Sequence, residues 1–277
     1  METREKIQFP EFKGKPLIKI PEYIPRIDFL GGDFGKAVLE EHKARVNEDY
    51  HNNDNLKVLR YDKKQEVVTG SNSFATTLIN KIIAEQGHTA TQAELERILK
   101  LGVLDLQGYY EDTGLVLRSK KEPNSYLVND LFSQLRNIEL PVMIPLKNLG
   151  LRNDNNSPYG LAFNILREAI YAPILNHDSG NFSSEDIDEE TGLTKKLGQG
   201  NRFFYTMKKG LSRLYMGRIL GAVAYNENLT ISCDNGRVVV VSGEAAQKNF
   251  DDYISHLQIE IDKRFTEFLK YLQTGKK

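Results

Sequence analysis

The stretch that decides the fold runs from Gly210 to Ser242 and reads GLSRLYMGRILGAVAYNENLTISCDNGRVVVVS. From Leu214 onward its residues divide into two alternating series, as the two faces of a β-strand do. The first series is mostly apolar and comprises Leu214, Met216, Arg218, Leu220, Ala222 and Ala224. The second mixes glycine, tyrosine and aliphatic residues and comprises Tyr215, Gly217, Ile219, Gly221, Val223 and Tyr225. We expect the first series to face a core and the second to face solvent.

The second series is unusual for a half-buried strand, which carries polar residues on its outer face and few glycines. It holds two glycines and two tyrosines but no charged residue. Composition alone favours an irregular edge strand beside a turn.

Two longer patterns suggest a more specific interpretation. The residues from Gly210 match GLSRLxMxRxLxA, and those from Leu229 match LTxSxxxGRVVVV. Together they resemble the variable region of diversity-generating-retroelement proteins, and are most similar to the archaeal (Nanoarchaeota-type) variable proteins. The similarity extends upstream over residues 182–193 and 200–206. In that family an error-prone reverse transcriptase mutates the adenines of a template copy, which then replaces the variable region.

The resemblance implies a fold, a function and a set of binding residues. The fold would be α+β, a single C-type-lectin-like domain over residues 1–277 of the formylglycine-generating-enzyme-like type, with 211–241 as its variable region. The protein would be a receptor rather than an enzyme, and its partner a protein or glycan on another cell or particle. The variable, ligand-binding positions would be Tyr215, Gly217, Ile219, Gly221, Val223, Tyr225, Asn226, Asn228, Ile231, Cys233, Asp234 and Asn235.

The residue types at these positions agree with such a mechanism. Adenine changes in the codons AAC and AAT reach every one of them, but do not reach Met, Trp, Lys, Gln or Glu. Glu227 therefore comes from another codon or is fixed, and Met216 fits a scaffold role. Cys233 is better explained as one product of a mutable codon than as a selected thiol.

Charge and cysteine content exclude several other classes. The chain of 277 residues carries 37 basic and 38 acidic side chains, a net charge of −1, which argues against a protein built mainly to grip nucleic acid. A single cysteine rules out an internal disulfide framework. We find no apolar run of the roughly 18 residues that a membrane span needs, and no hydrophobic segment after the charged N-terminus to suggest a signal peptide. We therefore expect a soluble protein without membrane insertion.

Catalytic and metal-binding motifs are incomplete. Residues 30–36 lack the leading glycine and the final Ser or Thr of a phosphate-binding loop. The acidic residues 186–197 resemble a calcium loop, but the glycine comes one position late and Leu197 stands where a bidentate Glu belongs. The five histidines are scattered, so no helical metal face arises. We expect no catalytic residue, cofactor or structural metal.

The rest of the chain contains residues that typically mark the beginning or the end of helices and loops. Four prolines predict an extended arm within residues 1–30, and 176–202 form a long polar insert. Apolar periodicity predicts a long helix over 244–274, packed either on this chain's own core or against a second copy. Capping and periodicity predict further helices at 34–47, from Ser73 to Gly87, after a Thr91–Glu94 capping box, and at 125–136 after Asn124.

Two other functions stay open at this point. The related lectin-like fold also hosts formylglycine-generating oxidases, although these use a cysteine pair or a metal site. A structural or assembly protein acting through the helix at 244–274 is the second alternative.

Overall fold

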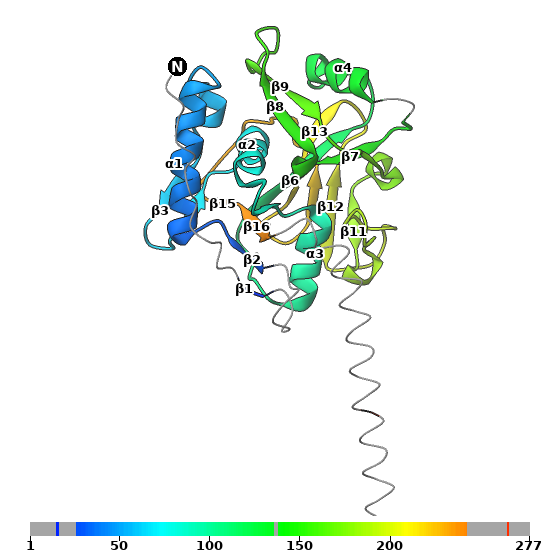
Figure 1. Cartoon of the computed structure of the whole chain (residues 1–277). Coiled ribbons are helices and arrows are strands. Elements are labelled where there is room, and N and C mark those ends of the chain that lie inside the picture. Colours follow the sequence, from blue (N-terminus) through cyan, green and yellow to red (C-terminus); the bar gives the residue numbers. More distant parts are fainter. Residues whose placement is uncertain (1–14, 17–25, 136–137, 243–264, 266–277) are drawn as a thin grey trace, which may run out of the picture.

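The strand β13 (Leu211–Met216) lies inside an eight-stranded sheet (Figure 1). The computed structural model describes residues 15–16, 26–135, 138–242 and 265, and its fold is mixed α+β. β13 pairs antiparallel with β6 (Tyr110–Leu117) on one side and β14 (Ala222–Ala224) on the other. The expectation of an edge strand is wrong, because β13 has a hydrogen-bonded neighbour on each side.

The other strands belong to this sheet, to a smaller sheet or to hairpins. The large sheet also contains β7 (Val142–Pro145), β10 (Ile170–Tyr171), β11 (Gly180–Phe182), β12 (Arg202–Thr206) and β15 (Gly236–Arg237). A four-stranded sheet joins β1 (Lys15–Pro16), β2 (Arg26–Phe29), β16 (Val239–Ser242) and β5 (Gly87–Thr89). The hairpins are β3 (Arg60–Asp62) with β4 (Val67–Thr69), and β8 (Leu149–Asn153) with β9 (Leu161–Ile165).

The described part of the chain has four α-helices and four short 3-10 turns. The helices are α1 (Gly32–Glu48), α2 (Ser73–Ile83), α3 (Gln92–Leu101) and α4 (Ser125–Gln134). The turns are η1 (Asp54–Leu56), η2 (Leu146–Asn148), η3 (Pro173–Asn176) and η4 (Ser184–Asp186). Within the described residues, no helix combines the length and the apolar character needed to cross a bilayer.

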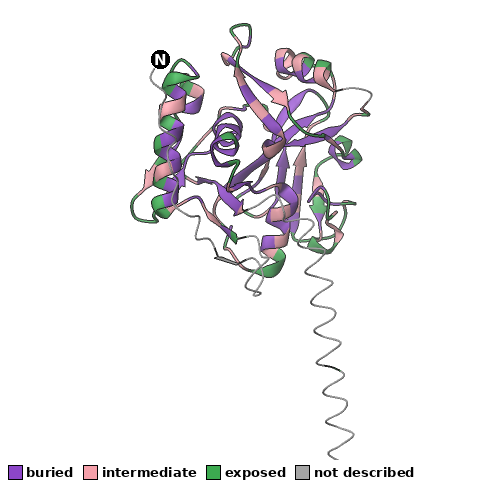
Figure 2. Cartoon of the chain, viewed as in Figure 1, coloured by how far each residue is buried: buried purple, intermediate pink, exposed green. Residues whose placement is uncertain are grey.

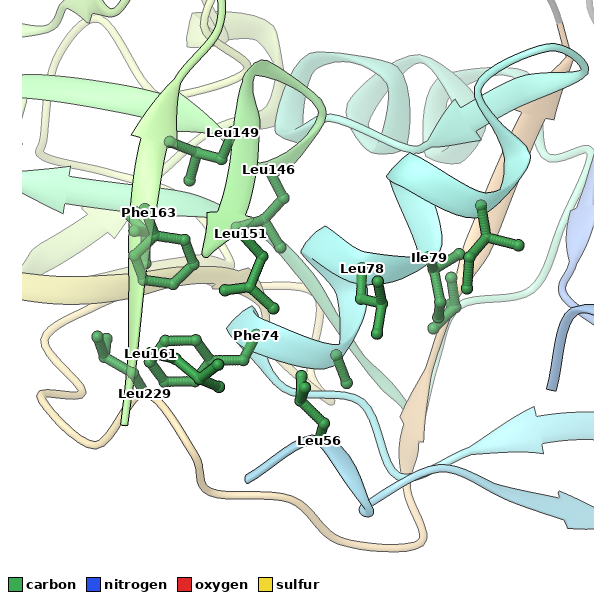
Figure 3. Close-up of a cluster of buried hydrophobic side chains, with 14 of the residues drawn as sticks. Leu56, Phe74, Leu78, Ile79, Leu146, Leu149, Leu151, Leu161, Phe163 and Leu229 are labelled. Carbon is green, nitrogen blue, oxygen red and sulfur yellow. The ribbon is translucent and has the colours of Figure 1, made fainter. Parts of the chain in front are cut away.

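The main core forms around α2, which is buried over nearly its whole length (Figure 2). Phe74 stacks on Phe163 of β9, with ring centroids 4.8 Å apart and planes 7° from parallel. Figure 3 shows Leu229 in the same cluster, although Leu229 belongs to the loop after β14. The core therefore anchors the segment that the sequence marks as variable. A second apolar cluster contains Phe182, Leu214 and Phe204.

Three of the predicted helices are confirmed near their predicted starts. The capping box of α3 is confirmed, because Thr91 Oγ1 accepts from Glu94 N and the Glu94 carboxylate accepts from Thr91 N. The helix at 34–47 is confirmed as α1. The helix starting at Ser73 is confirmed too, but its N-cap is Asn72, whose Oδ1 accepts from Ala75 N at 2.8 Å.

Two helix-end predictions were wrong. Gly87 does not end α2, which stops at Ile83; Gly87 instead begins β5. Asn124 precedes α4 as expected, but its side chain makes no cap and its φ is +64°. The Asn124 amide is used elsewhere, as described below.

The polar insert at 176–202 is partly ordered by the scaffold. It contains β11 and η4, and Ile187 pairs with Thr194 in an isolated bridge. Gly192, with φ +68°, lies so close to α3 that a Cβ there would be 2.3 Å from Ala93 N. Apart from residue 265, the predicted helix at 244–274 lies outside the described residues, as does most of the predicted arm at 1–30.

Replacing the stacked ring should test the main core. We expect Phe163→Ala to lower the free energy of unfolding by about 3–5 kcal/mol, because it leaves a cavity against Phe74. Leu166→Ala is the matched control from the residue after β9, where the side chain is 65% exposed, and should change stability by less than about 0.5 kcal/mol. Urea denaturation of both variants measures the difference; equal losses would contradict this description of the core.

Candidate functional site

The candidate site is formed by two segments, the turn at 217–221 between β13 and β14 and the loop at 225–235 before β15. We call them the display loops. Of the predicted variable residues, six are exposed, namely Ile219, Tyr225, Asn228, Ile231, Cys233 and Asp234. Three are half-buried, namely Tyr215, Asn226 and Asn235. Three are buried, namely Gly217, Gly221 and Val223.

Gly221 departs from the expectation because backbone surrounds it. A Cβ at Gly221 would lie 2.5 Å from the carbonyl oxygen of Phe203, closer than non-bonded atoms can approach. At Gly217 a Cβ would lie 3.1 Å from a methyl of Val223, a tight contact. Both glycines therefore let strands or side chains approach closely, and neither presents a side-chain position to solvent.

Val223 lies on the expected face of the sheet but is only 6% exposed. Its cross-strand partners are Tyr205 on β12 and Tyr215 on β13, so its side chain shares a face with two much larger ones. A small side chain between larger neighbours loses contact with solvent even on an outward face.

Arg218 departs from the expectation in the other direction. It belongs to the series expected to face the core, yet it is exposed. The reason is that β13 ends at Met216, so the alternation of faces stops before Arg218. The Arg218 carbonyl accepts from Gly108 N at 2.9 Å, which holds the turn against the start of β6.

A buried ion pair lies beneath the display loops. Arg213 of β13 and Asp112 of β6 are 1% and 0% exposed, and their nitrogen and oxygen atoms are 2.6 Å apart. Asp112 also accepts a hydrogen bond from Ser71 Oγ at 3.0 Å. Burial alone would lower the pKa of Arg213, but the Asp112 carboxylate raises it, so the guanidinium stays charged.

The same arginine holds the loop at 225–235 in two places. Arg213 Nη1 donates to the carbonyl of Ile231 at 2.8 Å, and Arg213 N donates to the carbonyl of Asn226 at 2.8 Å. Both contacts are to backbone oxygens. They are therefore available whatever side chains stand at positions 226 and 231.

Two more buried arginines hold the ends of β14 in the same way. Arg202 forms an ion pair with Glu96 at 2.6 Å and donates from Nε to the carbonyl of Leu220 at 2.7 Å. Arg118 donates from Nη2 to the carbonyl of Ala224 at 2.5 Å. A guanidinium suits this task, because it has five donors and stays protonated.

Neutral side chains hold the rest of the loop. Asn124 Nδ2 donates to the carbonyl of Glu227 at 2.8 Å, and Asn72 Nδ2 donates to that of Thr230 at 3.1 Å. Cys233 N donates to the hydroxyl of Tyr110 at 3.1 Å.

The Tyr110 hydroxyl is both an acceptor and a donor. Burial raises the pKa of Tyr110 to about 12, so its hydroxyl keeps a proton and donates to the carbonyl of Ser71.

The display residues themselves contribute less to the loop. Asn226 Oδ1 accepts from Asn228 N, and Asn228 Oδ1 accepts from Thr230 N, each at 3.0 Å. Both are local turns that Asp or Ser can also form. Apart from these two turns, the contacts described above hold the backbone of the display loops through residues that are not among the predicted variable positions.

The acidic residues at 186–197 resemble a calcium loop in sequence. The described residues contain no group of three or more His, Cys, Asp or Glu side chains placed to hold a metal ion. In the acidic stretch, Asp188 Oδ1 accepts from Thr191 N at 2.9 Å and from Thr191 Oγ1 at 3.0 Å. These hydrogen bonds lower the pKa of Asp188 and show that it closes a turn.

Comparison with family models, with curated proteins and with solved structures finds no match to this chain.

Sequence reasoning missed most of the residues that hold the loop. Arg213 and Arg202 lie within the segments that resemble the retroelement family, but the resemblance assigns neither of them a structural role. A charged residue between Ser212 and Leu214 in an otherwise uncharged strand was a usable signal of a buried pair. Its partner Asp112 could not be found in the same way, because pairing 101 positions apart depends on strand order.

Removing one partner of the buried ion pair should lower the stability of the fold. We expect Arg213→Met to lower the free energy of unfolding by about 3–5 kcal/mol, because it leaves Asp112 charged and unpaired in the interior. Arg60→Met is the matched control, since Arg60 and Asp234 form an exposed pair at 3.7 Å that should contribute at most about 1 kcal/mol. Chemical denaturation of both variants decides; a cost for Arg213→Met no larger than the control's would contradict the role given to the pair.

Glu111 gives a pH-dependent prediction. Glu111 is only 3% exposed. Burial, and then the charge of Asp112, raise its pKa well above the ordinary 4.5. The folded chain therefore keeps this proton while the unfolded chain releases it, so this group's contribution to stability falls as pH rises from 4.5 toward the folded pKa.

Glu111→Gln should remove this loss of stability at higher pH, because glutamine does not release a proton. We expect the variant's stability advantage over the wild type to grow by about 1.4 kcal/mol per pH unit across that range. Urea denaturation of the variant and the wild type between about pH 5 and 8 measures the slope. A difference between variant and wild type that does not change with pH would refute the assignment.

Proposed function

We propose that the chain is a receptor-type binding protein without catalytic activity, whose ligand surface is diversified by a retroelement. Its scaffold is of the C-type-lectin-like kind, and its display loops carry the variable residues. The partner is a protein or glycan on another cell or particle. The proposal joins the resemblance of residues 210–242 to the geometry of the display loops.

One observation carries the proposal: residues outside the predicted variable set hold the display loops by their backbone atoms. Carbonyls at 220, 224, 226, 227, 230 and 231, and the amide at 233, are all bonded to residues outside the predicted variable set. A surface that accepts many sequences needs a backbone conformation that does not depend on those sequences. Preorganisation of this kind also lowers the entropy lost when a ligand binds.

The geometry narrows the set of freely variable positions. The six exposed residues meet solvent, where a substitution usually changes stability by less than about 0.5 kcal/mol. Gly221 is different, because any side chain there meets the β12 backbone. Under this proposal most diversity falls on Ile219, Tyr225, Asn228, Ile231, Cys233 and Asp234.

Paired substitutions within one turn test this division. We expect Ile219→Asn to change the free energy of unfolding by less than about 0.5 kcal/mol, since Ile219 is 68% exposed. Gly221→Asn should cost about 1–3 kcal/mol or more, because the β12 backbone has to move. The two residues are two positions apart and receive the same side chain, so a similar cost at both would count against the proposal.

The DNA around the gene provides a test of the proposed diversification. A near-copy of codons 211–241, differing at adenines, should lie close to a reverse-transcriptase gene. Sequencing the genomic neighbourhood settles the point, and a neighbourhood without such a repeat would rule out diversification of this chain.

A further inference from the structure

An aromatic pair that belongs to the scaffold lies beside the display loops. Along β12, Phe204 points inward and is fully buried, whereas Phe203 and Tyr205 alternate onto the opposite face and are partly exposed. The rings of Phe203 and Tyr205 are 4.4 Å apart and tilted by 45°. An outward strand face usually carries polar residues, so two adjacent aromatic rings there need an explanation.

The pair is continuous with the display surface. The ring of Tyr205 lies 5.9 Å from that of Tyr225, which is 50% exposed. Through the strand register, Tyr205 is also opposite Val223, which in turn is opposite Tyr215. Ring contacts thus link Phe203, Tyr205 and Tyr225, and Tyr215 lies one strand further on, beyond Val223. We call these four residues the aromatic row; two of them belong to the predicted variable region and two do not.

The row is uncharged. Asn181, opposite Phe203 on β11, continues it with an amide. The guanidiniums of Arg202, Arg213 and Arg118 near the row are all buried. Those of Arg202 and Arg213 are paired with Glu96 and Asp112, and that of Arg118 donates to Thr206 Oγ1 and to the carbonyl of Ala224. A charged group placed on this row would lose its water without gaining an opposite charge, so the row complements an uncharged, apolar surface.

We propose that Phe203 and Tyr205 form a constant anchor that packs on the uncharged apolar centre of a folded protein partner, while the display loops contact its surroundings. The centres of protein–protein interfaces are rich in Tyr and Phe and poor in charge, and tyrosine is over-represented among the residues that dominate binding energy. The inference rests on the proposed function. It adds that part of the binding energy comes from residues that diversification does not change.

The test uses the full chain displayed on yeast, with the six exposed display positions randomised. The library is selected against three folded proteins, lysozyme, streptavidin and ubiquitin, and separately against bead-bound maltoheptaose as a neutral glycan. Independent binders then receive Tyr205→Thr, Tyr205→Leu and the conservative Tyr205→Phe. Tyr171→Thr is the matched control, because Tyr171 is an exposed tyrosine on β10 at the other edge of the large sheet. Thermal unfolding of each variant shows that it is folded, and the Leu variant removes the ring even if the Thr variant unfolds.

We expect binders of all three proteins to lose roughly tenfold or more in affinity with Tyr205→Thr or Tyr205→Leu, whatever their display residues. Tyr205→Phe and Tyr171→Thr should change affinity less than about threefold, within the range of a near-neutral contact. Binders that keep their affinity without the ring would overturn the anchor but leave the proposed function intact. Binders obtained only on the glycan would overturn the protein partner. A selection without any binder would contradict the proposed function, and the anchor with it.

Discussion

The structure of the display surface depends on the buried ion pair between Asp112 and Arg213. The pair joins the two central strands of the large sheet, β6 and β13, and extends through the guanidinium to the carbonyl of Ile231. An ion pair in a protein interior gains little net stability over an apolar pair, because both charges lose their water. Its value here is directional: a guanidinium can donate to a carboxylate and a loop carbonyl at once, which an apolar side chain cannot do. The chain therefore accepts the cost of burying two charges where loop geometry has to be defined.

The same solution recurs around the display loops. Arg202 and Arg118 reach the ends of β14, and Asn124 and Asn72 reach the loop that follows. Leu229 adds an apolar anchor in the main core (Figure 3). A loop of this length is ordinarily ordered by its own side chains, and substitutions then disturb it. Here, apart from the two turns that Asn226 and Asn228 close, the order comes from residues outside the predicted variable set. That is the physical condition for changing many surface residues without refolding the loop.

Local sequence signals and long-range ones differed in what they revealed. The capping box at Thr91 and Glu94 could be predicted because its two residues are three positions apart and form it by themselves. The alternation from Leu214 correctly predicted the burial of Leu214, Met216 and Ala222. It failed at Arg218, where the strand had already ended, and at Gly221, whose burial depends on the approach of β12. Helix ends without a side-chain cap, such as the end of α2, were likewise out of reach, because tertiary packing decides them.

The exposed residues of the candidate site could be predicted from the sequence, but the residues that hold the display loops could not. The exposed residues Ile219, Tyr225 and Ile231 follow from a pattern within one short segment. Asn124 and Asn72 lie 103 and 158 positions from the loop carbonyls that they hold, and Asp112 lies 101 positions from Arg213. Nothing in their local sequence distinguishes these three from ordinary polar residues. The aromatic pair on β12 was also missed, since two aromatic residues flanking another are typical of any buried strand.

If residues outside the predicted variable set hold the display loops, amide hydrogen exchange in the loops does not depend on the display side chains. Exchange at the amides of Arg213 and Cys233 reports the bonds to Asn226 and Tyr110. It should be measured in the wild type and in a chain with Ile219, Tyr225, Ile231 and Asp234 all changed to serine. We expect protection at both amides to be the same in the two proteins. Loss of protection in the changed chain would show that the display side chains hold the loop, and would contradict the account.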